Sequence, residues 1–128
     1  MKPETAKWTR KAETDWEVAH KLAGETPPPR DVVCFHCQQA AEKYLKALLQ
    51  ENGLVVPRTH QLDDLIVLLL PGYATLARLR RKADSLTQYA VDYRYPGLTA
   101  SKRKMEAALR NVDQIRLECR SQLNLPPA

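Results

Sequence analysis

A polar stripe lies between Cys34 and Leu49, where the sequence reads CFHCQQAAEKYLKALL. Its members recur at steps of three and four residues: His36, Gln39, Lys43 and Lys46. A helix would place them all on one face. Such a face carries an imidazole, an amide and two ammonium groups, so it can bind an anionic ligand or a second subunit. The alternative is a face that only contacts solvent.

A second candidate site is Arg94, which stands among tyrosines in the run YAVDYRYPG. A guanidinium group there can hold a phosphate through charge-assisted, bidentate hydrogen bonds. The adjoining Tyr95 can stack on a base, although tyrosines at helix ends also serve as packing residues. The alternative for Arg94 is a structural ion pair with Asp92 or another carboxylate.

The third candidate is His60, which follows Arg58 and Thr59 at the expected start of a helix. Unpaired N–H groups at a helix N-terminus attract anions, so His60 can lie near a bound phosphate. The alternative is that Thr59 caps the helix and His60 only occupies its first turn.

The segment also contains cysteines, which raises the question of a metal site. Cys34, His36 and Cys37 offer three ligands, but a structural zinc site needs four and no matching second pair is present. We therefore expect neither a metal nor a cofactor. The odd number of cysteines does not suit a disulfide framework, so reduced, buried thiols are expected.

Helices are the elements that must position these residues. Apolar residues recur at steps of three and four in five segments, at about 8–23, 32–52, 62–69, 73–93 and 105–119. Glycines and prolines separate the segments. We expect Asp31 to cap the second helix and Thr59 the third. Because no alternating, valine-rich run occurs, the sequence predicts an all-α, antiparallel helical bundle.

Length and charge further restrict the domain organisation and the kind of partner that the sequence allows. The 128 residues suffice for a single domain, with a core at about 5–123. The net charge is +5, and residues 73–128 hold 11 Lys and Arg against 5 Asp and Glu. This excess favours an anionic partner. The sequence shows neither a membrane span nor a secretion signal, so we expect a cytoplasmic protein with no membrane partner.

Three motifs together resemble the HEPN family, the higher eukaryotes and prokaryotes nucleotide-binding domains. They are CFHCQQAAEKYLKALL, PRTHQLDDL and YAVDYRYPG, in the expected order and spacing. The resemblance implies an up-and-down bundle of four main helices with a short extra helix. It also implies a homodimer, commonly encoded beside a minimal nucleotidyltransferase.

Many members of that family resemble metal-independent ribonucleases in which an arginine is followed four to six residues later by a histidine. Arg94 takes the place of that arginine, whereas the histidine positions hold Thr99, Ala100 and Ser101. The general acid or base for phosphodiester cleavage is therefore missing, so we expect no catalytic residues.

We accordingly expect a non-catalytic HEPN-type subunit that binds a nucleotide or RNA, or docks on a minimal nucleotidyltransferase. Two alternatives stay open: a toxin-type ribonuclease in which His36 or His60 replaces the missing histidine, and a purely structural dimer. The expected ligand-binding residues are Arg94, Tyr95, His36, Gln39, Lys43 and His60.

Overall fold

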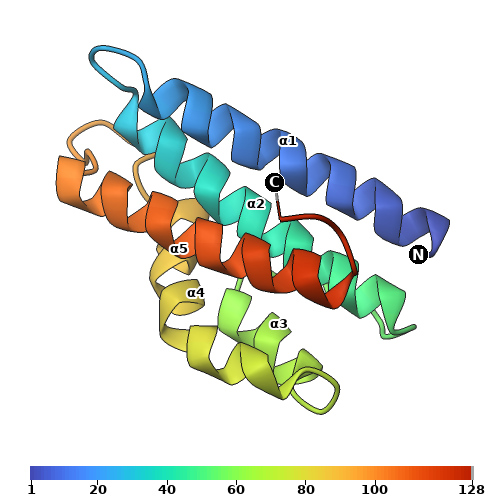
Figure 1. The fold of residues 1–128 in the computed structure, drawn as a ribbon. Coiled ribbons are helices and arrows are strands. Elements are labelled where there is room, and N and C mark those ends of the chain that lie inside the picture. Colours follow the sequence, from blue (N-terminus) through green and yellow to red (C-terminus); the bar gives the residue numbers. More distant parts are fainter. Residues whose placement is uncertain (128) are drawn as a thin grey trace.

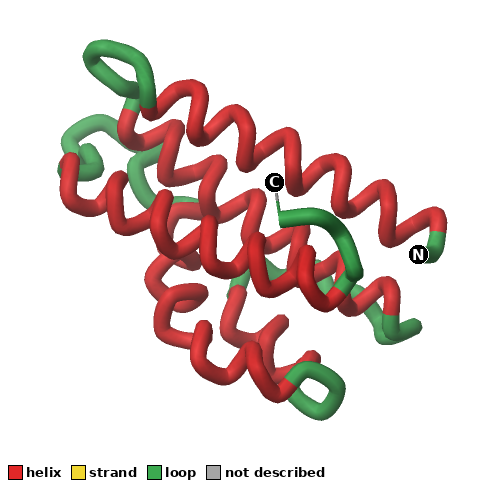
Figure 2. Tube along the Cα trace, viewed as in Figure 1, coloured by secondary structure: helices red, strands yellow, loops and turns green. Residues whose placement is uncertain are grey.

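The computed structural model describes residues 1–127, which form helices joined by loops (Figure 1; Figure 2). Within that range no β-strand occurs, so the all-α fold predicted from the sequence is confirmed. The elements are α1 (Pro3–Ala23), α2 (Arg30–Glu51), α3 (Leu62–Leu69), the 3₁₀ helix η1 (Ala74–Leu79), α4 (Arg80–Thr87), the 3₁₀ helix η2 (Gln88–Ala90) and α5 (Lys102–Gln122).

The three long helices lie side by side, and α2 packs against both α1 and α5 (Figure 1). α1 runs opposite to α2, whereas α2 and α5 begin at the same end of the bundle. The shorter α3 and α4 lie across the lower side of the bundle in Figure 1. α2 is therefore enclosed on several sides.

The central place of α2 explains its composition. Its fully buried apolar residues include Tyr44, Leu45 and Leu48. Its buried set also contains polar residues, Gln38, Glu42 and Lys46, because neighbours cover more than one face of the helix. α2 ends before Gly53, which has a φ of 69°. That conformation favours glycine, which agrees with the prediction that glycines and prolines separate the helical segments.

The helix expected over about 73–93 is interrupted, which corrects the prediction of one continuous helix. It consists of η1, α4 and η2, with turns after Ala90. Its buried residues explain the change: Leu76, Leu79, Ala83, Leu86 and Tyr89. Most of these steps are three residues, and a 3₁₀ helix with three residues per turn keeps such positions on one face.

Both predicted capping roles are wrong. α2 begins with Arg30 after Pro29, which puts Asp31 inside the first turn. The Asp31 carboxylate instead accepts the backbone N–H of Ala100 at 2.7 Å and so ties the start of α5 to α2. Thr59 accepts the N–H of Gln61, which is itself the residue before α3. The sequence did not show at which residue each helix begins, and the Asp31 partner depends on how the chain packs, because Ala100 lies 69 positions away.

Candidate functional site

Arg94 lies on the irregular segment between η2 and α5. The backbone at Tyr93 has a φ of 67°, so the chain changes direction immediately before Arg94. The Arg94 guanidinium donates from Nη2 to the carbonyl of Ala90 at 3.0 Å. This bond to the preceding turn orients the side chain and leaves most of its N–H donors available.

Arg94 borders a shallow hollow of about 240 Å³, called here the Arg94 hollow. It is lined by Asp31, Val32 and Phe35 of α2 and by Asp92, Tyr93 and Arg94. The ion pair with Asp92 that the sequence left open is not formed. Across residues 1–127, no carboxylate oxygen lies within 4.0 Å of the Arg94 guanidinium.

Aromatic and basic groups surround the same turn. The rings of Tyr89 and Tyr93 stack with centroids 5.8 Å apart, and burial raises the pKa of Tyr89 to about 12. Lys104 donates to the Tyr93 hydroxyl at 3.3 Å. Tyr95 is 75% exposed. The turn thus combines a second cation with one exposed aromatic ring.

The three positions where the family's histidine would fall have other surroundings. Ala100 is buried and its N–H is bonded to Asp31. Ser101 caps α5, because its hydroxyl accepts the N–H of Lys104 at 3.1 Å. Thr99 lines a larger hollow of about 960 Å³ beside the Pro27–Pro29 loop. None of these side chains titrates near neutral pH.

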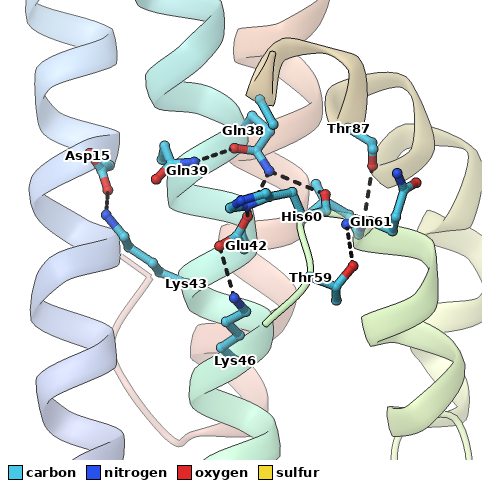
Figure 3. Close-up of polar contacts among 12 residues, drawn as sticks. Asp15, Gln38, Gln39, Glu42, Lys43, Lys46, Thr59, His60, Gln61 and Thr87 are labelled. Carbon is cyan, nitrogen blue, oxygen red and sulfur yellow. Dashed lines mark hydrogen bonds and ion pairs between the residues drawn. The ribbon is translucent and has the colours of Figure 1, made fainter. Parts of the chain in front are cut away.

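The predicted α2 residues lie away from the Arg94 hollow. His36 Nδ1 is 2.9 Å from Asp15 of α1, and Lys43 also bonds to that carboxylate. Gln39 donates to the side chain of Gln38 at 2.6 Å (Figure 3). None of His36, Gln39 and Lys43 lines the Arg94 hollow. Within one chain, the six predicted residues therefore do not form one site.

The fourth member of the stripe, Lys46, belongs to a buried network. Its Nζ lies 3.0 Å from Glu42 and sits over the Trp8 ring at 5.8 Å. Gln38 also donates to Glu42, and His60 Nδ1 lies 2.7 Å from it (Figure 3). Burial would raise the pKa of Glu42, but these hydrogen bonds hold it below its ordinary value. Its carboxylate is thus kept ionised.

Sequence reasoning missed this network, although a signal existed. Gln38, Glu42 and Lys46 recur at steps of four, which puts them on one helix face. His60 is 62% exposed on its side chain and covers the network from the loop before α3. Its Nδ1 atom contacts Glu42, and its place near a bound phosphate stays a prediction.

All three histidines contact carboxylates. His20 Nε2 lies 2.7 Å from Asp113, and the other two pair with Asp15 and Glu42. Among the residues that the structure describes, no cluster of three or more potential metal ligands was found. Burial raises the pKa of Cys34 to about 11, which suits an inert thiol.

Comparison with known proteins identifies the fold. The chain matches the HEPN domain family over residues 5–122. It is 25% identical to TT1696 from Thermus thermophilus, whose crystal structure superposes with a TM-score of 0.83 over 94% of this chain and 99% of that one. It is 26% identical to ST0689, an archaeal HEPN homologue, with a TM-score of 0.74 over 96% of this chain and 99% of that one. The comparison with curated proteins found no match.

The family match covers most of the chain, so the protein belongs to the HEPN domain family. The family predicted from the three sequence motifs is therefore confirmed. Along residues 1–127, no helix combines the length and apolar character that a bilayer crossing requires.

Proposed function

We propose that the protein is a non-catalytic HEPN-type subunit that binds the phosphate of a nucleotide or RNA at Arg94. The observation that supports this role is the state of the guanidinium, which borders a hollow and has one backbone hydrogen bond but no carboxylate partner among residues 1–127. A phosphate satisfies such a group through charge-assisted bonds.

Neighbouring groups extend the proposed site. Lys104 supplies a second positive charge beside Tyr93, and the exposed ring of Tyr95 offers a surface on which a base can stack. Val32 and Phe35 provide an apolar wall. The hollow is also lined by the carboxylates of Asp31 and Asp92, which repel a free anion. The aromatic and apolar surfaces therefore favour a nucleotide or single-stranded RNA over a free inorganic anion.

The same geometry argues against catalysis. Phosphodiester cleavage at neutral pH needs a group that transfers a proton, and the site has none at positions 99–101. The toxin-type ribonuclease alternative requires His36 or His60 to come close to Arg94 within the dimer. Each histidine is instead bonded to a carboxylate of its own, Asp15 or Glu42.

We also propose that the protein forms a homodimer, as its family resemblance implies. Val91 and Leu98 are exposed on the turns that flank Arg94, and Val32 is exposed in the hollow. Exposed apolar side chains of this kind favour a protein contact. A dimer would allow His36 of the partner subunit to approach Arg94. Light scattering at tens of micromolar should report twice the chain mass, whereas a monomer would exclude this composite site.

Docking on a minimal nucleotidyltransferase is the second candidate, and the same exposed apolar residues favour it. Val91→Asp should abolish co-elution with a purified minimal nucleotidyltransferase. Val67→Asp, which alters an exposed valine on α3, is the matched control. Unchanged co-elution with Val91→Asp would contradict docking through this surface.

The test of phosphate binding is calorimetric titration with AMP and with a short mixed-sequence RNA. Arg94→Ala should weaken binding, whereas Arg81→Ala should not. Arg81 is exposed on α4 and does not line the Arg94 hollow, so it controls for the loss of one positive charge. Equal weakening by both variants would indicate general charge attraction and contradict the site.

A further inference from the structure

The chain folds back after α5 and crosses toward α1 (Figure 1). The reversal occurs at Asn124, which has a φ of 58°, and the N–H of Leu125 then donates to the Arg120 carbonyl at 2.8 Å. Leu123 is buried and Leu125 packs against the core. Residues 124–127, called here the C-terminal strap, therefore lie in a defined place.

Two arginines of α5 bind consecutive carbonyls of the strap. Arg120 Nε donates to the Pro126 carbonyl at 2.5 Å, and Arg116 Nη1 donates to the Pro127 carbonyl at 2.8 Å. Prolines have no N–H, so the strap offers acceptors here without needing acceptors in return. The contact thus consists of arginine side chains that donate hydrogen bonds to consecutive backbone carbonyls.

The arginines are held in place independently of the strap. Arg116 is 4% exposed, bonds to Glu13 of α1 at 2.8 and 2.6 Å, and lies 3.7 Å from the centroid of the Trp16 ring. Arg120 Nη1 donates to the Tyr44 hydroxyl at 3.1 Å. Burial would raise the pKa of Glu13, but hydrogen bonds from Arg116 and Tyr44 hold it below its ordinary value. These contacts preorganise both donors.

We infer that Arg116 and Arg120 form a binding surface for an extended, proline-containing segment of a partner protein, and that the strap occupies this surface in cis. The strap defines the chemistry of the occupant: an apolar residue that packs on the core, followed by two prolines that present their carbonyls. Proline pairs favour the extended polyproline conformation, which lowers the entropy lost on binding.

Occupation in cis has a consequence for affinity. A tethered segment acts at an effective concentration of about millimolar, so a partner segment of equal strength cannot displace it at ordinary concentrations. Release of the strap should expose the surface. The arginines lie in the C-terminal half of α5, whereas the Arg94 hollow is lined by the start of α2, so this inference is independent of the proposed phosphate site.

The experiment uses the full chain with Asn124→Pro. Proline cannot adopt the positive φ of Asn124, and it also removes the hydrogen bond from the Asn124 N–H to the Ser121 carbonyl, so the variant should release the strap at the end of α5. The probe is a synthetic peptide with the sequence of residues 123–128, LNLPPA. Calorimetry should show that the variant binds the peptide at least about tenfold more tightly than the unaltered chain, because competition by the strap is removed.

Two controls test which groups of the protein and of the peptide are needed for binding. Adding Arg120→Gln to Asn124→Pro should weaken peptide binding about fivefold or more, and a peptide with both prolines replaced by alanine should also bind more weakly. Affinity for RNA should not change in any of these variants. Arg94→Ala should weaken RNA binding and leave peptide binding unchanged, so the two proposals can fail separately.

A folded Asn124→Pro variant that does not bind the peptide, or binds it no better than the unaltered chain, would overturn the inference. Circular dichroism melts establish whether the variant is folded. If it is not, Leu125→Asp provides the same test, because Leu125 is only partly buried and anchors the strap. A folded Leu125→Asp variant that does not bind the peptide, or binds it no better than the unaltered chain, would likewise overturn the inference.

Discussion

Two arginines of this protein, Arg94 and Arg116, have opposite surroundings. Arg116 is nearly fully buried, makes a two-pronged contact with Glu13 and stacks on Trp16. Arg94 borders an open hollow and, among residues 1–127, bonds only to the carbonyl of Ala90. Removing a partner from a buried ion pair leaves an uncompensated charge, whereas an unpaired cation at the surface costs little. The comparison separates a residue that holds helices together from one suited to bind a ligand.

The largest effect is expected for Arg116→Ala. The change leaves the Glu13 carboxylate without its main partner and removes the contact with Trp16, so the free energy of unfolding should fall by about 3–5 kcal/mol. Urea denaturation measures this loss. Affinity for RNA should be unchanged in the folded fraction. A loss below about 1 kcal/mol would mean that the pair contributes no more than a surface ion pair.

A smaller effect, on binding rather than stability, is expected for Arg94→Ala. Binding of a nucleotide or short RNA should weaken by about 1.5–3 kcal/mol, the typical contribution of a hydrogen bond to a charged group. The melting temperature should stay the same. Lys102→Ala should cost less, because Lys102 is exposed and already lies near Glu106. A lower melting temperature with unaltered affinity would instead make Arg94 structural, like Arg116.

The Glu42 network should make stability depend on pH. Because the folded-state pKa of Glu42 lies below its ordinary value of 4.5, its contribution is complete above about pH 4.5 and is lost as the pH falls through the folded pKa. Burial raises the pKa of Glu42 and the hydrogen bonds lower it, so stability changes with pH only by the difference between these two effects. Urea denaturation of the native chain and Glu42→Gln should converge as the pH falls from about 6 to about 3. A constant difference between them would contradict this assignment.

The last prediction is that the protein does not cleave RNA. Metal-free protein should leave a mixed RNA substrate intact over hours, because no proton-transfer group lies at positions 99–101. Gel analysis of labelled RNA measures this. Cleavage that disappears with Arg94→Ala would show that another group serves as acid or base, and His36→Ala and His60→Ala would then identify it.

Much of the fold was predictable from local signals. Apolar residues at steps of three and four, ended by residues such as Gly24 and Gly53, located α1, α2 and α5. The segment at 73–93 was harder to predict, because a spacing of three suits both a 3₁₀ helix and one face of an α-helix. Only the packing of residues such as Leu76 and Tyr89 decides between them.

The candidate site was less predictable than the fold. Arg94 and Tyr95 do share one turn, as their adjacency in the sequence required. His36 and Lys43 share a helix face, but both pair with Asp15 of α1. Helical periodicity predicts which side of α2 a residue occupies, but it does not predict which other helix or loop covers that side.

The sequence by itself determined the helical class, the family and the absence of the motif histidine, because these depend on residue types at fixed local spacings. Only the tertiary structure decided which charges are buried. Glu13 and Arg116 are separated by 103 positions, and they meet only because α1 and α5 pack together. Such pairings depend on how helices pack over long separations in sequence, and local patterns carry no information about them.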